Sequence, residues 1–352
     1  MYEYETLKAC HKMLVEMFHA YPGEVIVITC DTGSNMNVVE STAAAASLLG
    51  CKPLVVKMPT PRGSGRAADP DLAVDALVAL IKNADLWIEY NHEWLYYSTV
   101  FARVFVEEAD PAKRPQHICL VDADEGMMIR NVGKVDFAVL RAFMHKVAEA
   151  TSASKHCRVT SPAGTDIEWD NVDPSIVPEG SFAVCDGVVG PGESVCLPGQ
   201  IGWSPDFDTL NGVLVIEGVL TPPIGLLKNN VKLTVEKGYI VNVEGEGSDA
   251  KRFEQWLASF NDRAMYLVAH LCYAFGPYSQ LTGSICEDER VWGATEWGFG
   301  NVGGQPKRQA PSHSDGLCLN SSMWLDGKQI LDKGVIVGPT PEIVELAHRL
   351  GH

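Results

Sequence analysis

An alternation of strand-like and helical segments in the N-terminal part most constrains how this chain can fold. Glu24–Cys30 is a continuous apolar run, Asn37–Leu49 is an alanine-rich helical stretch, and Pro53–Lys57 resumes extended structure. Continuous apolar runs of this length are typical of strands buried on both faces of a parallel sheet. The pattern continues in Asp71–Ile81, Ala84–Tyr90 and His117–Val121. We therefore predict a doubly wound α/β layer with an open, mostly parallel sheet.

The texture of the sequence changes near residue 156, where short β-like runs separated by Gly and Pro replace the alternation. Their spacing favours antiparallel β structure, and one helix, Asp249–Ala258, interrupts them. The runs are residues 157–160, 164–169, 181–184, 212–218, 231–235 and 237–241. We predict two domains: residues 1–152 form a Rossmann-like α/β domain, and residues 153–352 form an α+β, β-rich domain.

Composition narrows the choice of partner and compartment. The 352 residues carry a formal net charge of -17, which argues against nucleic acid or an anionic membrane as a partner. The chain has neither an apolar run long enough to span a membrane nor a basic, apolar leader, so we expect a cytoplasmic protein that acts on a small molecule. Its ten cysteines form no C-x-x-C pair and are expected to be reduced.

A possible metal site lies in the C-terminal half. In an extended segment, His313 and Asp315 project from the same face because side chains alternate. His270 lies in the apolar segment Val268–Tyr273, where an imidazole needs a partner. Two imidazoles and one carboxylate form the facial ligand set of non-haem Fe(II) oxygenases. The alternatives are a hydrogen-bonded core histidine at His270 and an Asx-type turn at His313 and Asp315.

Further candidate residues surround these three in the sequence. Glu217, at the end of an apolar strand, and Glu296, among aromatics and glycines, are candidate catalytic bases if burial raises their pKa. Tyr273, Trp297 and Phe299 are candidates for stacking on a flat substrate ring, with an ordinary core role as the alternative. The run Glu287–Glu289 is interpreted as a solvated turn.

Several segments resemble the 2,5-dihydroxypyridine 5,6-dioxygenases, the non-haem iron enzymes of bacterial nicotinate degradation. The resemblance runs in order from about residue 156 to 338. The matching segments are Ser161–Asp166, Lys237–Ile240, Phe260–Tyr266, Ala269–Leu271, Gly300–Gly304, Lys307–Arg308 and Pro311–Asp315. These enzymes are similar in turn to the M29 (aminopeptidase T) metallopeptidases, which pair an α/β N-terminal domain with a β-rich metal domain.

The resemblance implies that the iron ligands are His270, His313 and Asp315, and it adds Asp166 to the substrate-binding candidates. It also implies a homo-oligomer. The peptidase pattern needs two metals, but its second glutamate falls on His270 and its first histidine falls near Glu296. One family feature is missing, because no histidine lies between His156 and His270 to act as an acid-base helper. Cys196, Asp186 and Glu193 lie in that region without being obvious substitutes.

These observations lead to a main hypothesis and two rivals. The main hypothesis is an Fe(II)-dependent dioxygenase that uses O2 to cleave the ring of a hydroxylated N-heteroaromatic compound such as 2,5-dihydroxypyridine. The first rival is a metal-dependent hydrolase, aminopeptidase-like or amidohydrolase-like, with Zn2+ or Mn2+ in the same site and Glu217 as general base. The second rival is a catalytically silent relative that binds a small ligand.

Overall fold

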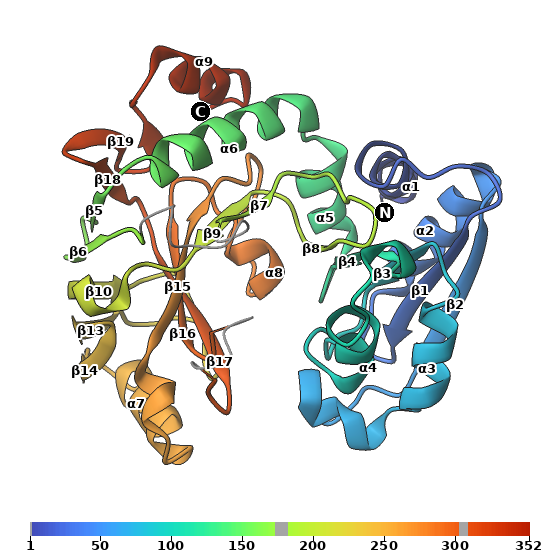
Figure 1. The fold of residues 1–352 in the computed structure, drawn as a ribbon, viewed down its shortest axis with the longest axis horizontal. Helices are drawn as coiled ribbons and strands as arrows, with labels where there is room; N and C mark the ends of the chain where they lie inside the picture. The colour runs from blue at the N-terminus through green and yellow to red at the C-terminus, as the bar shows by residue number, and fades with distance from the viewer. Residues whose placement is uncertain (1, 173–181, 303–308) are drawn as a thin grey trace. The chain divides into compact units, whose positions relative to one another are not determined.

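The structure is a computed structural model that describes residues 2–172, 182–302 and 309–352, and it divides into two compact units (Figure 1). The first unit contains residues 1–137 and 187–198, and the second contains residues 138–186 and 199–352. This division differs from a single boundary at residue 152, because nearly all of helix α6 (Phe137–Ser152) belongs to the second unit and a later segment returns to the first.

The first unit is built on a five-stranded parallel sheet with strand order β2-β1-β3-β4-β8. Strand β1 is buried along nearly its whole length, as its continuous apolar run predicts. The strands are β1 (Val25–Asp31), β2 (Lys52–Met58), β3 (Leu86–Glu89), β4 (Gln116–Cys119) and β8 (Ser194–Cys196). The helices are α1 (Glu3–Lys12), α2 (Met36–Leu48), α3 (Val74–Ile81), α4 (Thr99–Phe101) and α5 (Glu125–Met128). The predicted parallel α/β layer is confirmed.

Strand β8 was not predicted from the sequence. It pairs with β4 in parallel, with His117 opposite Ser194. The imidazole of His117 is fully buried, and its Nδ1 lies 2.8 Å from Ser194 Oγ while its Nε2 lies 3.3 Å from Glu89 Oε2. Because burial penalises the charged form, the pKa of His117 is lowered from its ordinary value.

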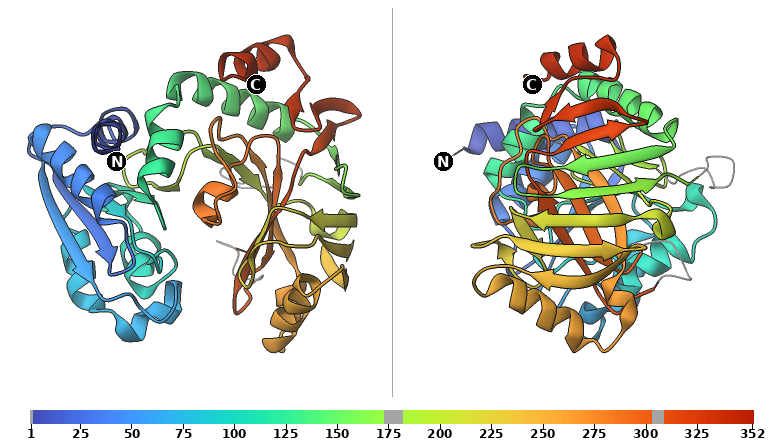
Figure 2. Two further views of the ribbon diagram at one scale, coloured as in Figure 1. Left: turned by 180° about the vertical axis from the view of Figure 1, so that it is seen from behind. Right: turned by 90° about the vertical axis from the view of Figure 1, so that its left-hand side faces the viewer.

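The second unit consists of two antiparallel sheets, one with strand order β14-β13-β10-β6-β5-β18-β19-β20 and one with order β12-β11-β17-β16-β15-β9-β7. Figure 2 shows the strands of the first of these sheets face-on in its right-hand view. The strands of the first sheet are β5 (His156–Thr160), β6 (Asp166–Asp170), β10 (Asn211–Ile216), β13 (Val231–Glu236), β14 (Tyr239–Glu244), β18 (Ser322–Leu325), β19 (Lys328–Asp332) and β20 (Val335–Ile336). Those of the second are β7 (Phe182–Cys185), β9 (Gln200–Trp203), β11 (Val219–Thr221), β12 (Gly225–Leu226), β15 (Val268–Ala274), β16 (Thr295–Gly300) and β17 (His313–Cys318).

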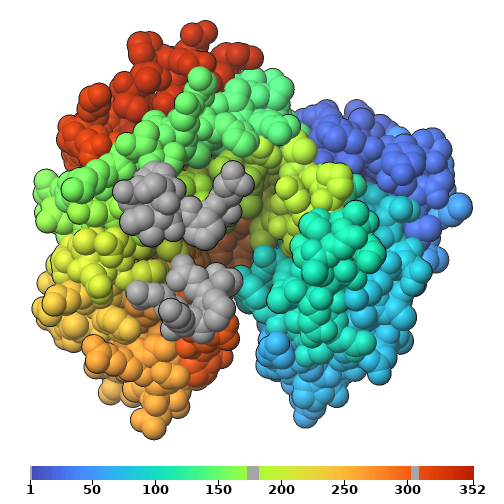
Figure 3. Space-filling view, viewed as in Figure 1, coloured from blue at the N-terminus to red at the C-terminus, as the bar shows by residue number. Residues whose placement is uncertain are grey.

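Aromatic side chains join these two sheets and the helices beside them. Trp169 of β6 meets Trp297 of β16 edge to face, with ring centroids 5.7 Å apart. Phe253 of helix α7 (Asp249–Ser259) meets Phe299 in the same manner. Helices α6 and α9 (Pro341–Arg349) lie side by side on the surface of this unit, where Lys146 Nζ is 3.4 Å from Glu342 Oε2 (Figure 3). Helix α8 (Ile285–Asp288) is a single turn.

Among the helices of the described residues, none combines the length and apolar character needed to cross a membrane.

The buried His117 should make the stability of the first unit depend on pH. Its lowered folded-state pKa means that the unfolded chain binds the proton more readily, so the free energy of unfolding should fall as pH drops through about 6.5. Urea unfolding between about pH 5 and pH 8, followed by circular dichroism, gives the free energy of unfolding at each pH. This free energy should depend less steeply on pH in His117→Asn than in wild type, by at most about 1.4 kcal/mol per pH unit. His11→Asn, an exposed histidine of the same unit, is the matched control. An equal slope in wild type and His117→Asn would refute this account.

Candidate metal centre

Four adjacent strands of the seven-stranded sheet, β9, β15, β16 and β17, carry the candidate site (Figure 1). His270 lies opposite Gly298 across the β15–β16 pair, and Gly298 lies opposite Asp315 across the β16–β17 pair. Since side chains alternate along a strand, these positions share one face of the sheet with His313 and Glu296. The other face carries Trp297 and packs against the eight-stranded sheet.

The three predicted metal ligands come together on the first of these faces. Nε2 of His313 lies 2.9 Å from Oδ1 of Asp315, and Nε2 of His270 lies 3.6 Å from the same oxygen. The two imidazole rings are nearly parallel, with centroids 5.1 Å apart. One possible ligand atom from each residue lies within 4.8 Å of the others. Three residues from two separate sequence segments therefore present their donor atoms to one point.

Gly298 creates the space in which the imidazole of His270 lies. A Cβ atom at this position would lie only 2.3 Å from Cε1 and 2.5 Å from Nδ1 of His270. Such distances are far below van der Waals contact, so any side chain at residue 298 would displace the ring. The glycine between His270 and Asp315 is thus part of the geometry of the cluster.

The hydrogen bonds of His313 test whether these residues fit a metal. Nδ1 of His313 lies 2.8 Å from the carbonyl oxygen of Asn301 and must donate to it, which leaves Nε2 as the nitrogen that faces the site. A carboxylate oxygen of Asp315 lies 2.9 Å from this Nε2. Two acceptors at this separation repel each other unless a proton or a cation lies between them. The donor set and its hydrogen bonding fit a divalent metal ion.

The electrostatics of the cluster also favour a cation. Desolvation lowers the pKa of His270, but the negative charges of Glu296, Asp315 and Glu289 outweigh it and raise that pKa to about 9. Burial raises the pKa of Asp315, but the charges and hydrogen bonding of the neighbouring His313 and His270 lower it to about 2. Positive charge is therefore stabilised at this point of the sheet.

Comparison with known proteins places this chain in a family. The sequence profile of a family described as 2,5-dihydroxypyridine 5,6-dioxygenase matches residues 6–338. The chain belongs to this family. A 2,5-dihydroxypyridine 5,6-dioxygenase from Pseudomonas putida KT2440 is 28% identical over 155 residues, which is 38% of this chain and 42% of that protein. The chain thus matches about two fifths of the length of this curated relative.

Two solved structures share the fold of this chain. The structure of 2,5-dihydroxypyridine dioxygenase from Pseudomonas putida KT2440 superimposes with a TM-score of 0.71 and 20% identity, covering 96% of this chain and 98% of that one. Wild-type AmpT from Thermus thermophilus gives a TM-score of 0.67 and 12% identity, covering 96% and 100%. The predicted likeness to both the dioxygenases and the M29 aminopeptidase fold is confirmed.

The two predicted catalytic carboxylates occupy different surroundings. Glu296 is fully buried, and its Oε1 lies 3.3 Å from Nε2 of His270. Glu217 is half-buried and accepts a hydrogen bond from the backbone N–H of Leu319; burial raises its pKa. Among the described residues, Glu217 belongs to neither group that could hold a metal ion. The structure therefore brings Glu296, but not Glu217, beside His270.

The residues predicted to bind a substrate ring lie elsewhere. Trp297 and Phe299 point to the core between the sheets, because they alternate with Glu296 and Gly298. Tyr273 is fully buried, and its hydroxyl lies 3.0 Å from Thr151 Oγ1. Asp166 is exposed and forms a bidentate ion pair with Arg158. The core alternative describes the three aromatic residues better than ring stacking.

The prediction of a solvated turn at Glu287–Glu289 was wrong, because Glu287 is 1% and Asp288 0% exposed. The carboxylate of Asp288 accepts hydrogen bonds from the backbone N–H groups of Thr282 and Gly283, which compensates its burial. The matching positions Gly303, Gly304, Lys307 and Arg308, and the strand residue Ser181, lie outside the described residues.

The residues beside Glu296 on this face of the sheet were not predicted from the sequence. Gln200 of β9 donates to Oε2 of Glu296 at 3.1 Å, and Cys272 lies opposite Glu296 across the β15–β16 pair. Gln200 is 70 residues from His270 in the chain, and nothing in the sequence around it marks it as functional. Only the pairing of β9 with β15 brings it to this face.

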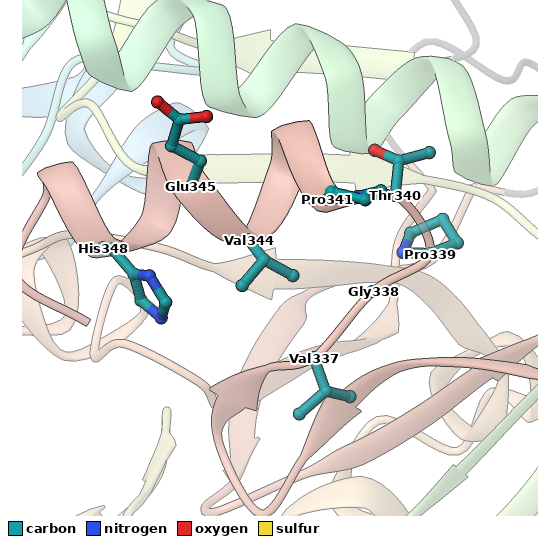
Figure 4. A pocket seen from close by; sticks show the side chains of 8 residues that line it. All are labelled: Val337, Gly338, Pro339, Thr340, Pro341, Val344, Glu345 and His348. Carbon is teal, nitrogen blue, oxygen red and sulfur yellow. The ribbon is translucent and has the colours of Figure 1, made fainter.

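A groove lies elsewhere in the second unit, away from the candidate metal centre. It has a volume of about 530 Å³ and is lined by residues 337–341 and by Val344, Glu345 and His348 of α9 (Figure 4). It shares no residue with the cluster around His270.

The role of Gly298 can be tested by adding a single methyl group. Gly298→Ala should displace His270 and reduce the bound metal, while the fold persists. Elemental analysis of the purified protein, with circular dichroism as the test of folding, measures both effects. Gly218→Ala is the control, because a Cβ there meets only leucine side-chain ends at 3.3 Å or more. A Gly298→Ala protein with wild-type metal content would disprove this role.

Proposed function

We propose that this protein is a mononuclear non-haem Fe(II) dioxygenase that cleaves the ring of a hydroxylated N-heteroaromatic compound such as 2,5-dihydroxypyridine. The convergence of His270, His313 and Asp315 carries the proposal, because it forms the two-histidine, one-carboxylate set of this enzyme class. Membership of the 2,5-dihydroxypyridine 5,6-dioxygenase family supports the reaction type and the substrate class.

The residues of the cluster would each contribute to holding the metal. His270 and His313 present Nε2 atoms, and Asp315 presents Oδ1 and supplies one negative charge. The carbonyl of Asn301 fixes the tautomer of His313, so that its Nε2 keeps the lone pair. When bound, Fe(II) would supply open positions for an ionised substrate hydroxyl and for O2.

The chain has no histidine between His156 and His270 to act as the acid-base helper of the family. Asp186 is already engaged, because its carboxylate lies 2.7 Å from Nε2 of His145 and 3.2 Å from Nε of Arg141. The side chain of Glu193 accepts a hydrogen bond from the backbone of Gly190. Neither of these carboxylates is therefore free to replace the missing histidine.

Substitution of each predicted ligand tests the proposal. Anaerobically purified wild-type protein should contain about one iron per chain and consume O2 with 2,5-dihydroxypyridine. His270→Ala, His313→Ala and Asp315→Ala should each lose bound iron and at least about 100-fold in ring-cleavage activity, since each removes a direct ligand. Elemental analysis and O2 uptake measure the two effects.

His156→Ala is the matched control for these variants. His156 is an exposed imidazole of the same unit and also lies beside carboxylates, 3.0 Å from Asp170 and 3.7 Å from Glu168. Its substitution should leave iron content and activity unchanged. Stoichiometric zinc without O2 uptake would instead point to the metallohydrolase, and full iron content in His270→Ala would refute the site.

A further inference from the structure

Glu296 directs a carboxylate oxygen that accepts no hydrogen bond at His270 of the metal cluster. Its side chain is fully buried, and Oε1 has no hydrogen-bond partner among the described residues. Oε1 forms an ion pair with Nε2 of His270, 3.3 Å away. A carboxylate oxygen without a partner in a buried place is costly, so its surroundings need an explanation.

A buried chain of side chains fixes how this carboxylate is oriented. Oε2 of Glu296 accepts a hydrogen bond from Nε2 of Gln200 at 3.1 Å. The amide oxygen of Gln200 accepts one from Nη2 of Arg290 at 3.1 Å, and Nη1 of Arg290 pairs with Glu289 at 2.6 Å. Arg290 is only 2% exposed. One oxygen of Glu296 is therefore held by Gln200, and the other is directed at His270.

The spacing of the donor atoms around His270 matches ligands of a single ion. Two ligand atoms bound at about 2.1 Å with octahedral or tetrahedral angles lie about 3.0 to 3.4 Å apart. The separation of 3.3 Å between His270 Nε2 and Glu296 Oε1 falls in this range. Asp315 Oδ1 lies 2.9 Å from His313 Nε2 and 3.6 Å from His270 Nε2, which is close to this range. A ligating Nε2 has no proton to give to Glu296, which leaves the cation as the partner of Oε1.

We propose that Glu296 is a fourth protein ligand of the metal. This inference rests on the proposed metal site and changes its composition to two imidazoles and two carboxylates. The two carboxylates then balance the charge of a divalent ion, whereas Asp315 alone leaves one positive charge. A six-coordinate ion in this set keeps two open positions, enough for a substrate hydroxyl and O2.

The visible absorption of bound Co(II) tests the proposal, because its intensity and band positions report the coordination geometry and the kind of ligands. Glu296→Gln keeps the size of the side chain and should retain one metal per chain with an affinity about 10- to 100-fold lower, measured by competition with a chelator. The Co(II) spectrum should change as well. Glu254→Gln, at an exposed glutamate of the same unit outside both metal-binding groups, should match wild type in both measurements.

The outcomes separate this inference from the proposed function. If Glu296 only holds His270 in place, the affinity falls but the Co(II) spectrum stays as in wild type, and the fourth-ligand assignment is wrong. Two metals per chain, of which Glu296→Gln loses one, would assign Glu296 to a separate site with His270 and Cys272, and would also overturn it. Metal retained by His270→Ala would refute the metal site itself. Circular dichroism of each variant checks that it folds.

Discussion

The site depends on the approach of Nε2 of His313 and Oδ1 of Asp315 to 2.9 Å. The carbonyl of Asn301 takes the Nδ1 proton of His313, so this contact needs a second ring proton or a cation between the two atoms. Folding of the sheet nevertheless forces the two side chains onto one face, two residues apart on β17. A positive charge between the two atoms stabilises both of them, so the fold and the binding of a cation favour each other.

The seven-stranded sheet separates the two tasks of this unit by its two faces. The face that carries Trp297 and Phe299 is apolar and packs into the core, which supplies most of the stabilisation. The opposite face carries His270, Glu296 and Asp315, whose burial requires partners. Because neighbouring residues of β16 alternate between these faces, a single strand supplies both the core and the polar cluster.

Much of this arrangement could be predicted from the sequence. The apolar and β-like runs identified strands β1 to β7, β10, β13 and β14. The His-x-Asp spacing correctly placed His313 and Asp315 on one face. The same alternation should have separated Glu296 from Trp297, yet both were assigned to the site. Gln200 and Arg290 could not be predicted, because their role arises only when β9 pairs beside β15. The short charge run at Glu287 also misled, since hydrogen bonds to backbone N–H groups allow carboxylates to be buried.

The three residues of β8 give the chain an unusual connectivity. The polypeptide leaves the first unit after residue 137, enters the second, and returns for residues 187–198 before completing the second. An N-terminal fragment ending at residue 152 would lack Ser194, the partner of His117, and would expose the backbone of β4 along a new sheet edge. Such edges recruit strands from other molecules. The first unit is therefore not a separable module, and synthesis of the chain must pass residue 198 before its sheet is complete.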